Sequence, residues 1–117
     1  HADCPGVVLG VPAADTLKRA NVISSCPEVA DSCIGETVDR SGLWHAMTPQ
    51  VFRLGALLSA LTAARDSAVS VTDEAQAIEL SGSAPWLVRG RRSNIKLTYA
   101  EDIELIESVL SRRLEDV

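Results

Sequence analysis

The chain has 117 residues, with 11 lysines and arginines against 16 aspartates and glutamates, so its formal net charge is −5. This length predicts one domain, and 46% hydrophobic with 23% charged residues is the balance of a globular protein and not of a disordered one. The acidic balance excludes a general nucleic-acid coat or a binder of anionic membranes, and the longest apolar stretches are far shorter than the roughly 20 residues of a membrane span.

The cysteine pattern and the start of the chain give two further expectations. Cys4, Cys26 and Cys33 are odd in number and form no C-x-x-C pair, so we expect neither a disulfide framework nor a metal knuckle, and a cytoplasmic protein. No basic start with an apolar signal stretch precedes Cys4. The opening at His1, together with few predicted strands, leads us to expect residues missing before it.

The first third of the chain predicts a strand followed by an arm. The run VVLGV at residues 7–11, ended by Pro12, is typical of a strand covered on both faces in a parallel sheet. Residues 13–44 are polar and rich in turn residues, with two short alternating pieces at 16–19 and 36–39. We therefore expect an extended hairpin or arm at about 13–45, which would need another surface for stability, such as a partner subunit.

The remainder predicts helices and two short strands, and so an α/β unit. Apolar residues recur at helical spacing over 53–65. Thr72 is expected to cap a second helix that ends before Gly82, and Thr98 with Glu101 forms a capping box for a third helix with an apolar stripe to position 114. Strands are expected at 86–88 and 95–97, joined by a basic loop.

Positive charges stand out against this acidic background. They gather in two places: Arg89, Arg91, Arg92 and Lys96 follow one another closely, and Lys18, Arg19 and Arg40 lie on the arm. Such cations beside hydroxyl side chains suit a bound phosphate, and a solvated surface loop is the competing interpretation. The roles of the three arginines at 89–92 stay open.

Two threonines carry a similar ambiguity. Thr72, in the segment TDEA at 72–75, is either a plain helix start or a hydroxyl beside a bound anion. Thr48, in TPQ at 48–50, is either a turn or cap residue or a hydroxyl donor to a ligand. Neither a Walker loop nor G-x-G-x-x-G occurs, so a nucleotide site is not encoded in these residues.

Four segments in this order resemble one family. They are DTLKR at 15–19, TVDRSGLWHAMTPQ at 37–50, TDEA at 72–75, and NIKLT at 94–98 followed by Glu101 and Asp102. Together they are similar to the C-terminal half of 2-C-methyl-D-erythritol 4-phosphate cytidylyltransferase, of the non-mevalonate isoprenoid pathway. The long central motif is the specific one.

This resemblance implies an α/β, Rossmann-like nucleotidyltransferase fold with a protruding β-arm, in a homodimer whose arms complete each other's active sites. Residues 1–117 would be the C-terminal part of a single cytidylyltransferase domain. The resemblance implies that Thr16 and Arg40 meet the sugar phosphate held by the partner subunit, with Thr48 close by. It implies that Thr72 and Lys96 hold the same substrate from the subunit's own core, Lys96 being also the catalytic residue.

The substrates implied are CTP and 2-C-methyl-D-erythritol 4-phosphate, with Mg²⁺ as cofactor. The family's glycine-rich CTP loop and its acidic H-D-A-A-R-P motif do not occur in the 117 residues, so no metal ligand and no nucleotide-binding residue is assigned. We expect the full enzyme to be active and this segment alone to be inactive. The alternative is a non-catalytic anion-binding or dimerisation module.

Overall fold

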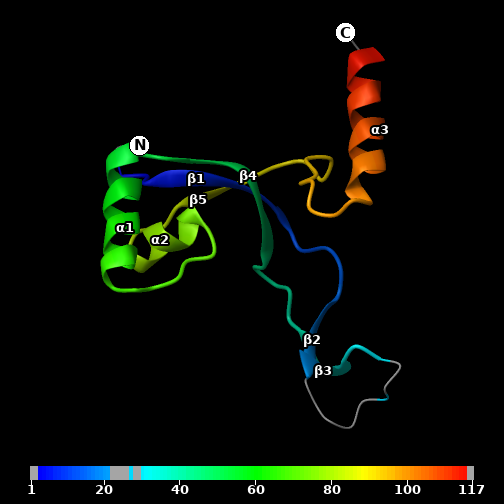
Figure 1. Cartoon of the computed structure of the whole chain (residues 1–117), viewed down its shortest axis with the longest axis horizontal. Coiled ribbons are helices and arrows are strands. Elements are labelled where there is room, and N and C mark those ends of the chain that lie inside the picture. Colours follow the sequence, from blue (N-terminus) through cyan, green and yellow to red (C-terminus); the bar gives the residue numbers. More distant parts are fainter. Residues whose placement is uncertain (1–2, 22–26, 28–29, 116–117) are drawn as a thin grey trace. The chain divides into compact units, whose positions relative to one another are not determined.

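The computed structural model describes residues 3–21, 27 and 30–115. The chain divides into two compact units: unit 1 comprises His1–Val11 and Ala46–Val117, and unit 2 comprises Pro12–His45. The elements follow one another along the chain as Figure 1 shows. Within the described residues, no helix is long and apolar enough to cross a membrane.

The sheet of unit 1 is built around β1 (Gly6–Pro12). Its strand order is β4-β1-β5, and β1 runs parallel to β5 (Trp86–Arg89), with Val8 opposite Leu87. Along β1, buried residues alternate with half-buried ones, so side chains on both faces are covered. The sequence prediction of a parallel, two-sided strand at 7–11 is therefore confirmed.

The strand β4 (Trp44–Phe52) corrects the sequence interpretation of residues 48–50. These residues continue a strand and do not form a turn or a cap, and the peptide bond between Thr48 and Pro49 is cis. A proline is tolerated here because β4 ends the strand order of this sheet, and an outer strand needs no backbone donor on its open side. In this sheet β4 and β5 flank β1.

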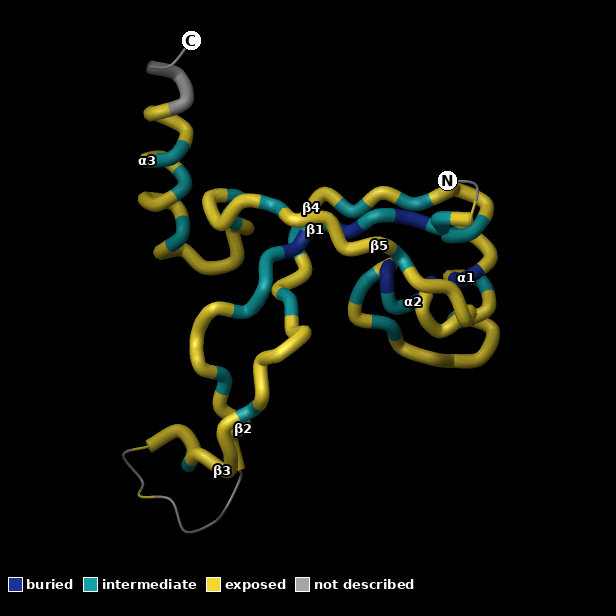
Figure 2. The backbone as a smooth tube through the Cα atoms, turned by 180° about the vertical axis from the view of Figure 1, so that it is seen from behind, coloured by how far each residue is buried: buried dark blue, intermediate teal, exposed yellow. Residues whose placement is uncertain are grey.

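A small aliphatic core lies where α1 (Leu54–Asp66) meets α2 (Glu74–Leu80). Ala60, Ala77 and Ile78 are buried together there, and half-buried hydrophobic residues surround them: Phe52, Ala56, Leu57 and Val71. Figure 2 shows the buried backbone on β1, α1 and α2. Alanines on both helices allow the two backbones to approach closely, as expected of a chain with only 3% aromatic residues.

The start of α2 lies one residue later than the sequence predicted. Asp73 is the N-cap, and its Oδ1 accepts a hydrogen bond of 2.8 Å from the backbone N–H of Gln76. Thr72 therefore stands outside the helix and does not cap it. Threonine and aspartate are both good capping residues, so local preference alone did not decide between the two neighbours.

The helix α3 (Asp102–Glu115) also begins differently from the prediction. Oδ2 of Asp102 accepts hydrogen bonds from the backbone N–H groups of Tyr99 (2.8 Å) and Thr98 (2.9 Å), so the carboxylate reaches backward to hold the turn before the helix. These two donors lower the pKa of Asp102. The predicted box of Thr98 with Glu101 is not the cap, and residues 95–97, predicted as a strand, are irregular.

Unit 2 contains a two-stranded antiparallel sheet of β2 (Leu17–Asn21) and β3 (Cys33–Val38), with an irregularity of register between Arg19 and Ala20. Nζ of Lys18 donates to Oγ1 of Thr37 over 2.6 Å, and Arg19 pairs with Glu36 at 2.6 Å on the exposed face. The unit spans the residues predicted as the arm.

The cysteine prediction needs a correction in this unit. Cys33 is disulfide-bonded, whereas Cys4 of unit 1 is a free thiol. The odd count argued against a disulfide framework, but an odd number of cysteines excludes only complete pairing and leaves a single disulfide possible. Cys26 lies outside the described residues.

Two glycines give a matched test of the backbone. Gly82, after α2, has φ +84°, and Gly55 lies inside α1; a Cβ added at either would meet no atom within 4 Å. Because only Gly82 needs the left-handed region, we expect Gly82→Ala to lower the free energy of unfolding by about 1–2 kcal/mol. Gly55→Ala should raise it by about 0.5 kcal/mol. Urea unfolding of both variants checks this, and equal effects would contradict it.

Candidate functional site

A cavity of about 550 Å³ in unit 1 brings together three of the five site residues predicted from sequence. Thr48 comes from β4, Thr72 from the residue before the α2 cap, and Lys96 from the segment between β5 and α3. The other lining residues are Gln50, Phe52, Leu57, Asp73 and Glu74. Residues far apart in the chain therefore meet around one space.

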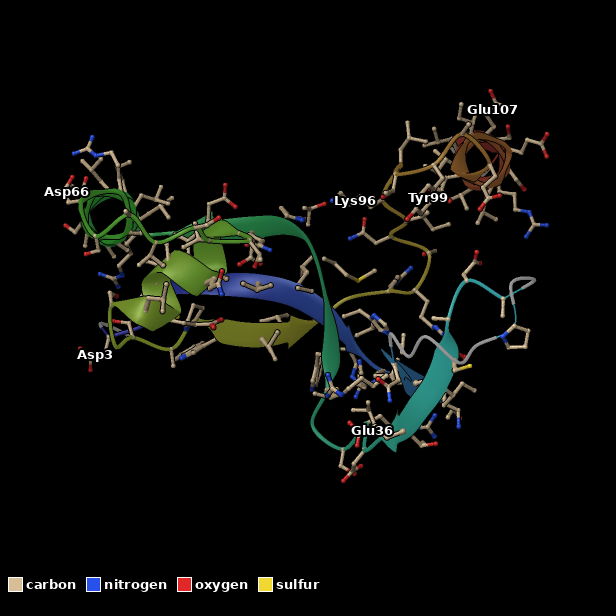
Figure 3. The ribbon with its side chains drawn as sticks, turned by 60° about the horizontal axis from the view of Figure 1, so that its bottom comes forward. Asp3, Glu36, Asp66, Lys96, Tyr99 and Glu107 are labelled. Atoms are coloured by element: carbon tan, nitrogen blue, oxygen red, sulfur yellow. The ribbon has the colours of Figure 1, made fainter. Side chains whose placement is uncertain are left out.

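Lys96 lies on an irregular segment, and Figure 3 shows it with Tyr99 between β5 and α3. The strand argument for the direction of its side chain therefore does not apply. What holds the segment is Asn94, whose Nδ2 donates a hydrogen bond of 2.6 Å to the backbone oxygen of Thr48. This bond ties the chain two residues before Lys96 to the strand that carries Thr48.

Thr72 is held by the side chain of Gln76. Oε1 of Gln76 lies 2.6 Å from the backbone nitrogen of Thr72 and 3.2 Å from its hydroxyl oxygen. Asp73 is fixed on both carboxylate oxygens, since Oδ1 caps α2 and Oδ2 accepts from Nε2 of Gln50 at 3.3 Å. The start of α2 and strand β4 are thus joined through side chains that line the cavity.

Gln50 leaves one unusual atom at this place. Its Oε1 is buried and has no hydrogen-bond partner among the described residues. A buried amide oxygen without a hydrogen-bond donor lowers the free energy of unfolding, so the presence of Gln50 at this position needs a structural reason. The reason is the hydrogen bond from Nε2 of Gln50 to Asp73. This bond fixes the orientation of the amide group, and in that orientation its oxygen faces no donor.

The charges around the cavity are mixed. Among the described residues that line it, Lys96 is the one cation, and Asp73 and Glu74 are carboxylates. A ligand with several negative groups would be repelled by this set, whereas a hydroxyl-rich molecule with one anionic group beside Lys96 matches it. The arrangement therefore suits a polyol that carries a phosphate.

The described residues do not form a metal site. Over residues 3–21, 27 and 30–115, no three His, Cys, Asp or Glu side chains gather closely enough to hold an ion. The described side chains thus do not fit the magnesium ion that the family resemblance implies. What they offer a ligand is hydrogen bonding and the charge of Lys96.

The remaining two predicted residues, Thr16 and Arg40, belong to unit 2 and are exposed. The guanidinium of Arg40 donates to the backbone oxygen of Ala14, which brings Arg40 close to the segment that carries Thr16. The neighbouring Asp39 accepts from the backbone N–H of Ser41 at 2.9 Å, and this bond lowers the pKa of Asp39. The two predicted arm residues thus share one end of the two-stranded sheet.

Several residues that organise the cavity were not singled out from the sequence. Asp73 and Gln76 have the D-x-x-Q spacing of a capping box, and this pattern favours Asp73 as the cap in place of Thr72. Gln50 and Asn94 act across long sequence separations, and no local pattern marks them. The arginines at 89, 91 and 92 are exposed and do not line the cavity.

Comparison with solved structures defines the class. A crystal structure of 4-diphosphocytidyl-2C-methyl-D-erythritol synthase superposes with TM-score 0.72 and 43% identity, covering 90% of this chain and 42% of that one. The 2-C-methyl-D-erythritol 4-phosphate cytidylyltransferase from Thermus thermophilus gives TM-score 0.74 at 28% identity, covering 92% and 49%. The chain therefore has the mixed α/β fold of part of these structures.

Sequence comparison gives the family. A profile described as IspD, 2-C-methyl-D-erythritol 4-phosphate cytidylyltransferase, matches residues 1–112. The relative from Acidithiobacillus ferrooxidans (strain ATCC 53993 / BNL-5-31) is 48% identical over 111 residues, which are 95% of this chain and 43% of the relative. The one from Pseudomonas putida (strain W619) is 55% identical over 104 residues, 88% and 41% respectively. The chain belongs to the 2-C-methyl-D-erythritol 4-phosphate cytidylyltransferase family, and it spans less than half the length of these curated relatives.

Proposed function

We propose that this chain carries the sugar-phosphate side of a cytidylyltransferase site. The full reaction transfers CMP from CTP to 2-C-methyl-D-erythritol 4-phosphate and yields 4-diphosphocytidyl-2-C-methyl-D-erythritol and pyrophosphate. The observation that carries the proposal is the single cavity lined by Thr48, Thr72 and Lys96. Its mixed charges suit a polyol phosphate, and the relatives bear the name of this activity.

The proposed reaction needs no general base to activate the attacking phosphate. An oxygen of the substrate phosphate forms a bond to the α-phosphorus of CTP, and the bond from that phosphorus to the bridging oxygen breaks, so pyrophosphate leaves with the electron pair. The attacking phosphate is already anionic, and no proton has to be removed from it. The task of Lys96 is to align this phosphate and to offset the crowded negative charge.

Within the same proposal, unit 2 is an arm that protrudes from a Rossmann-like domain and reaches across a homodimer in the cytoplasm. Thr16 and Arg40 then contact the sugar phosphate of the partner subunit. Their exposure and the sparse packing of a two-stranded sheet support this role, since such a sheet is marginally stable without another surface.

CTP and Mg²⁺ would be bound by residues outside these 117. The glycine-rich loop that the family uses for the nucleotide does not occur in this sequence. We therefore expect the chain by itself to bind the sugar phosphate without turnover.

A chimaera tests the proposal. This chain replaces the matching 43% of the Acidithiobacillus ferrooxidans relative, and pyrophosphate release is measured with CTP and 2-C-methyl-D-erythritol 4-phosphate. We expect activity within about tenfold of the parent enzyme, because 48% identity preserves the packing between the two parts. A folded chimaera without transfer would favour the alternative, a non-catalytic anion-binding or dimerisation module.

A further inference from the structure

The hydrogen bonds of Thr72 determine which chemical group its hydroxyl can recognise. The backbone N–H of Thr72 can only donate, so the Gln76 atom that faces it at 2.6 Å must be the amide oxygen and not the nitrogen. The same oxygen lies 3.2 Å from the Thr72 hydroxyl. An amide oxygen can only accept, and therefore the hydroxyl donates to it.

The Thr72 hydroxyl has a single hydrogen, and that hydrogen is directed to Gln76. What the hydroxyl can present to a ligand is its two lone pairs. The backbone of Gln76 is held at the start of α2, because its N–H donates to Oδ1 of Asp73 at 2.8 Å and Asp73 also accepts from Gln50. The contacts between Gln76 and Thr72 are thus present in the chain by itself.

We infer that Gln76 is a positioning residue that makes Thr72 a hydrogen-bond acceptor, so that Thr72 recognises a hydroxyl group on the carbon chain of the substrate and not its phosphate. This inference rests on the proposed function. An ionised phosphate oxygen accepts and cannot donate, so it has no favourable contact with a lone pair. The ammonium of Lys96, which lines the same cavity, supplies the donors that a phosphate needs.

The two carboxylates beside Thr72 also indicate that Thr72 faces a hydroxyl group of the substrate and Lys96 its phosphate. Asp73 and Glu74 also line the cavity, and both repel an anion placed near Thr72. A neutral hydroxyl of the substrate meets no such repulsion. The lining therefore offers acceptors at Thr72 and its neighbouring carboxylates and a cation at Lys96, so a polyol phosphate would bind with its phosphate at Lys96.

The experiment uses the active chimaera and the mono-deoxy analogues of 2-C-methyl-D-erythritol 4-phosphate. With native Gln76, we expect one analogue to lose about tenfold in kcat/KM through KM, the upper range for one hydrogen bond. In Gln76→Met, which keeps the length and the helix propensity but lacks the acceptor, the Thr72 hydrogen is free to point elsewhere. The discrimination should then fall to about twofold.

Two further variants separate recognition from folding. Gln76→Glu keeps an acceptor oxygen at the same reach and should retain the discrimination between the substrate and its analogue. Glu79→Met, an exposed change three residues further along α2, should leave it unchanged. If Gln76→Met unfolds the protein, Gln76→Leu is measured in its place.

Different outcomes contradict the inference about Gln76 and the proposed function. An inactive wild-type chimaera counts against the function; equal discrimination in wild type, Gln76→Met and Gln76→Leu overturns the inference. If the chimaera is inactive, the 117-residue chain is titrated with the sugar phosphate and the same analogues. Weaker binding of one analogue that disappears in Gln76→Met supports the inference, and any other result of the titration, including no binding at all, overturns it.

Discussion

Replacing Lys96 by alanine in the active chimaera should lower kcat/KM for 2-C-methyl-D-erythritol 4-phosphate by roughly 100-fold. The removed ammonium is the one cation lining the cavity in the part of the chain that the structure describes, and no other described lining residue replaces its charge. A charge-assisted hydrogen bond contributes about 1.5–3 kcal/mol, and about 1.4 kcal/mol corresponds to tenfold. Steady-state pyrophosphate release at varied sugar phosphate measures the change.

A matched control is Arg65→Ala, which removes one positive charge from the exposed end of α1, where Arg65 pairs with Asp66. Its kinetics should equal those of the unmodified chimaera. Lys96→Arg keeps the charge with a different reach and should recover part of the activity. A loss of less than about threefold in Lys96→Ala would mean that Lys96 is an ordinary surface lysine.

The second large effect is expected on unit 2. Arg40→Ala should raise KM for the sugar phosphate about tenfold or more and leave KM for CTP nearly unchanged, since the predicted contact of Arg40 is with the sugar phosphate alone. Arg19→Ala, which removes an exposed arginine of the same sheet and breaks its pair with Glu36, is the control. Identical constants for the two variants would remove Arg40 from the proposed site.

Mixed dimers test whether Arg40 acts across subunits. If the arm completes the partner's site, a dimer of one Arg40→Ala and one Lys96→Ala subunit contains one site with both changes and one intact site. Random mixing of the two impaired variants should then give roughly a quarter of the kcat/KM of the unmodified chimaera, above the value of either variant alone. No recovery on mixing would indicate that Arg40 acts within its own subunit.

The parts of the fold that could be predicted are those with a strong local signal. The apolar run at 7–11, the periodic stretch that forms α1, and the glycine after α2 each carry their own pattern, and each lies in the structure where it was expected. Strand β4 could not be predicted in this way. Its proline is locally typical of a turn, and only its place at the outside of a sheet makes the residue acceptable.

In the candidate site, too, residues within local motifs could be predicted and residues that act over long sequence separations could not. Thr48, Thr72 and Lys96 were named because family motifs surround them, and the cavity that they line needed the structure. The side chains that hold them were not named, because Gln50 and Asn94 act on partners 23 and 46 residues away. Hydrogen bonds of this kind depend on which segments the fold makes neighbours, and no window of sequence contains that information.

The order of strands in unit 1 has a consequence for how such a protein can change. Unit 2 begins at the end of β1 and ends within β4, and these two strands are neighbours in one sheet. Since its two ends are anchored side by side, lengthening or exchanging it costs the central sheet little beyond loop-closure entropy, which grows slowly with length. We therefore expect that unit 2 can vary in length and sequence with little effect on the strands β1 and β4.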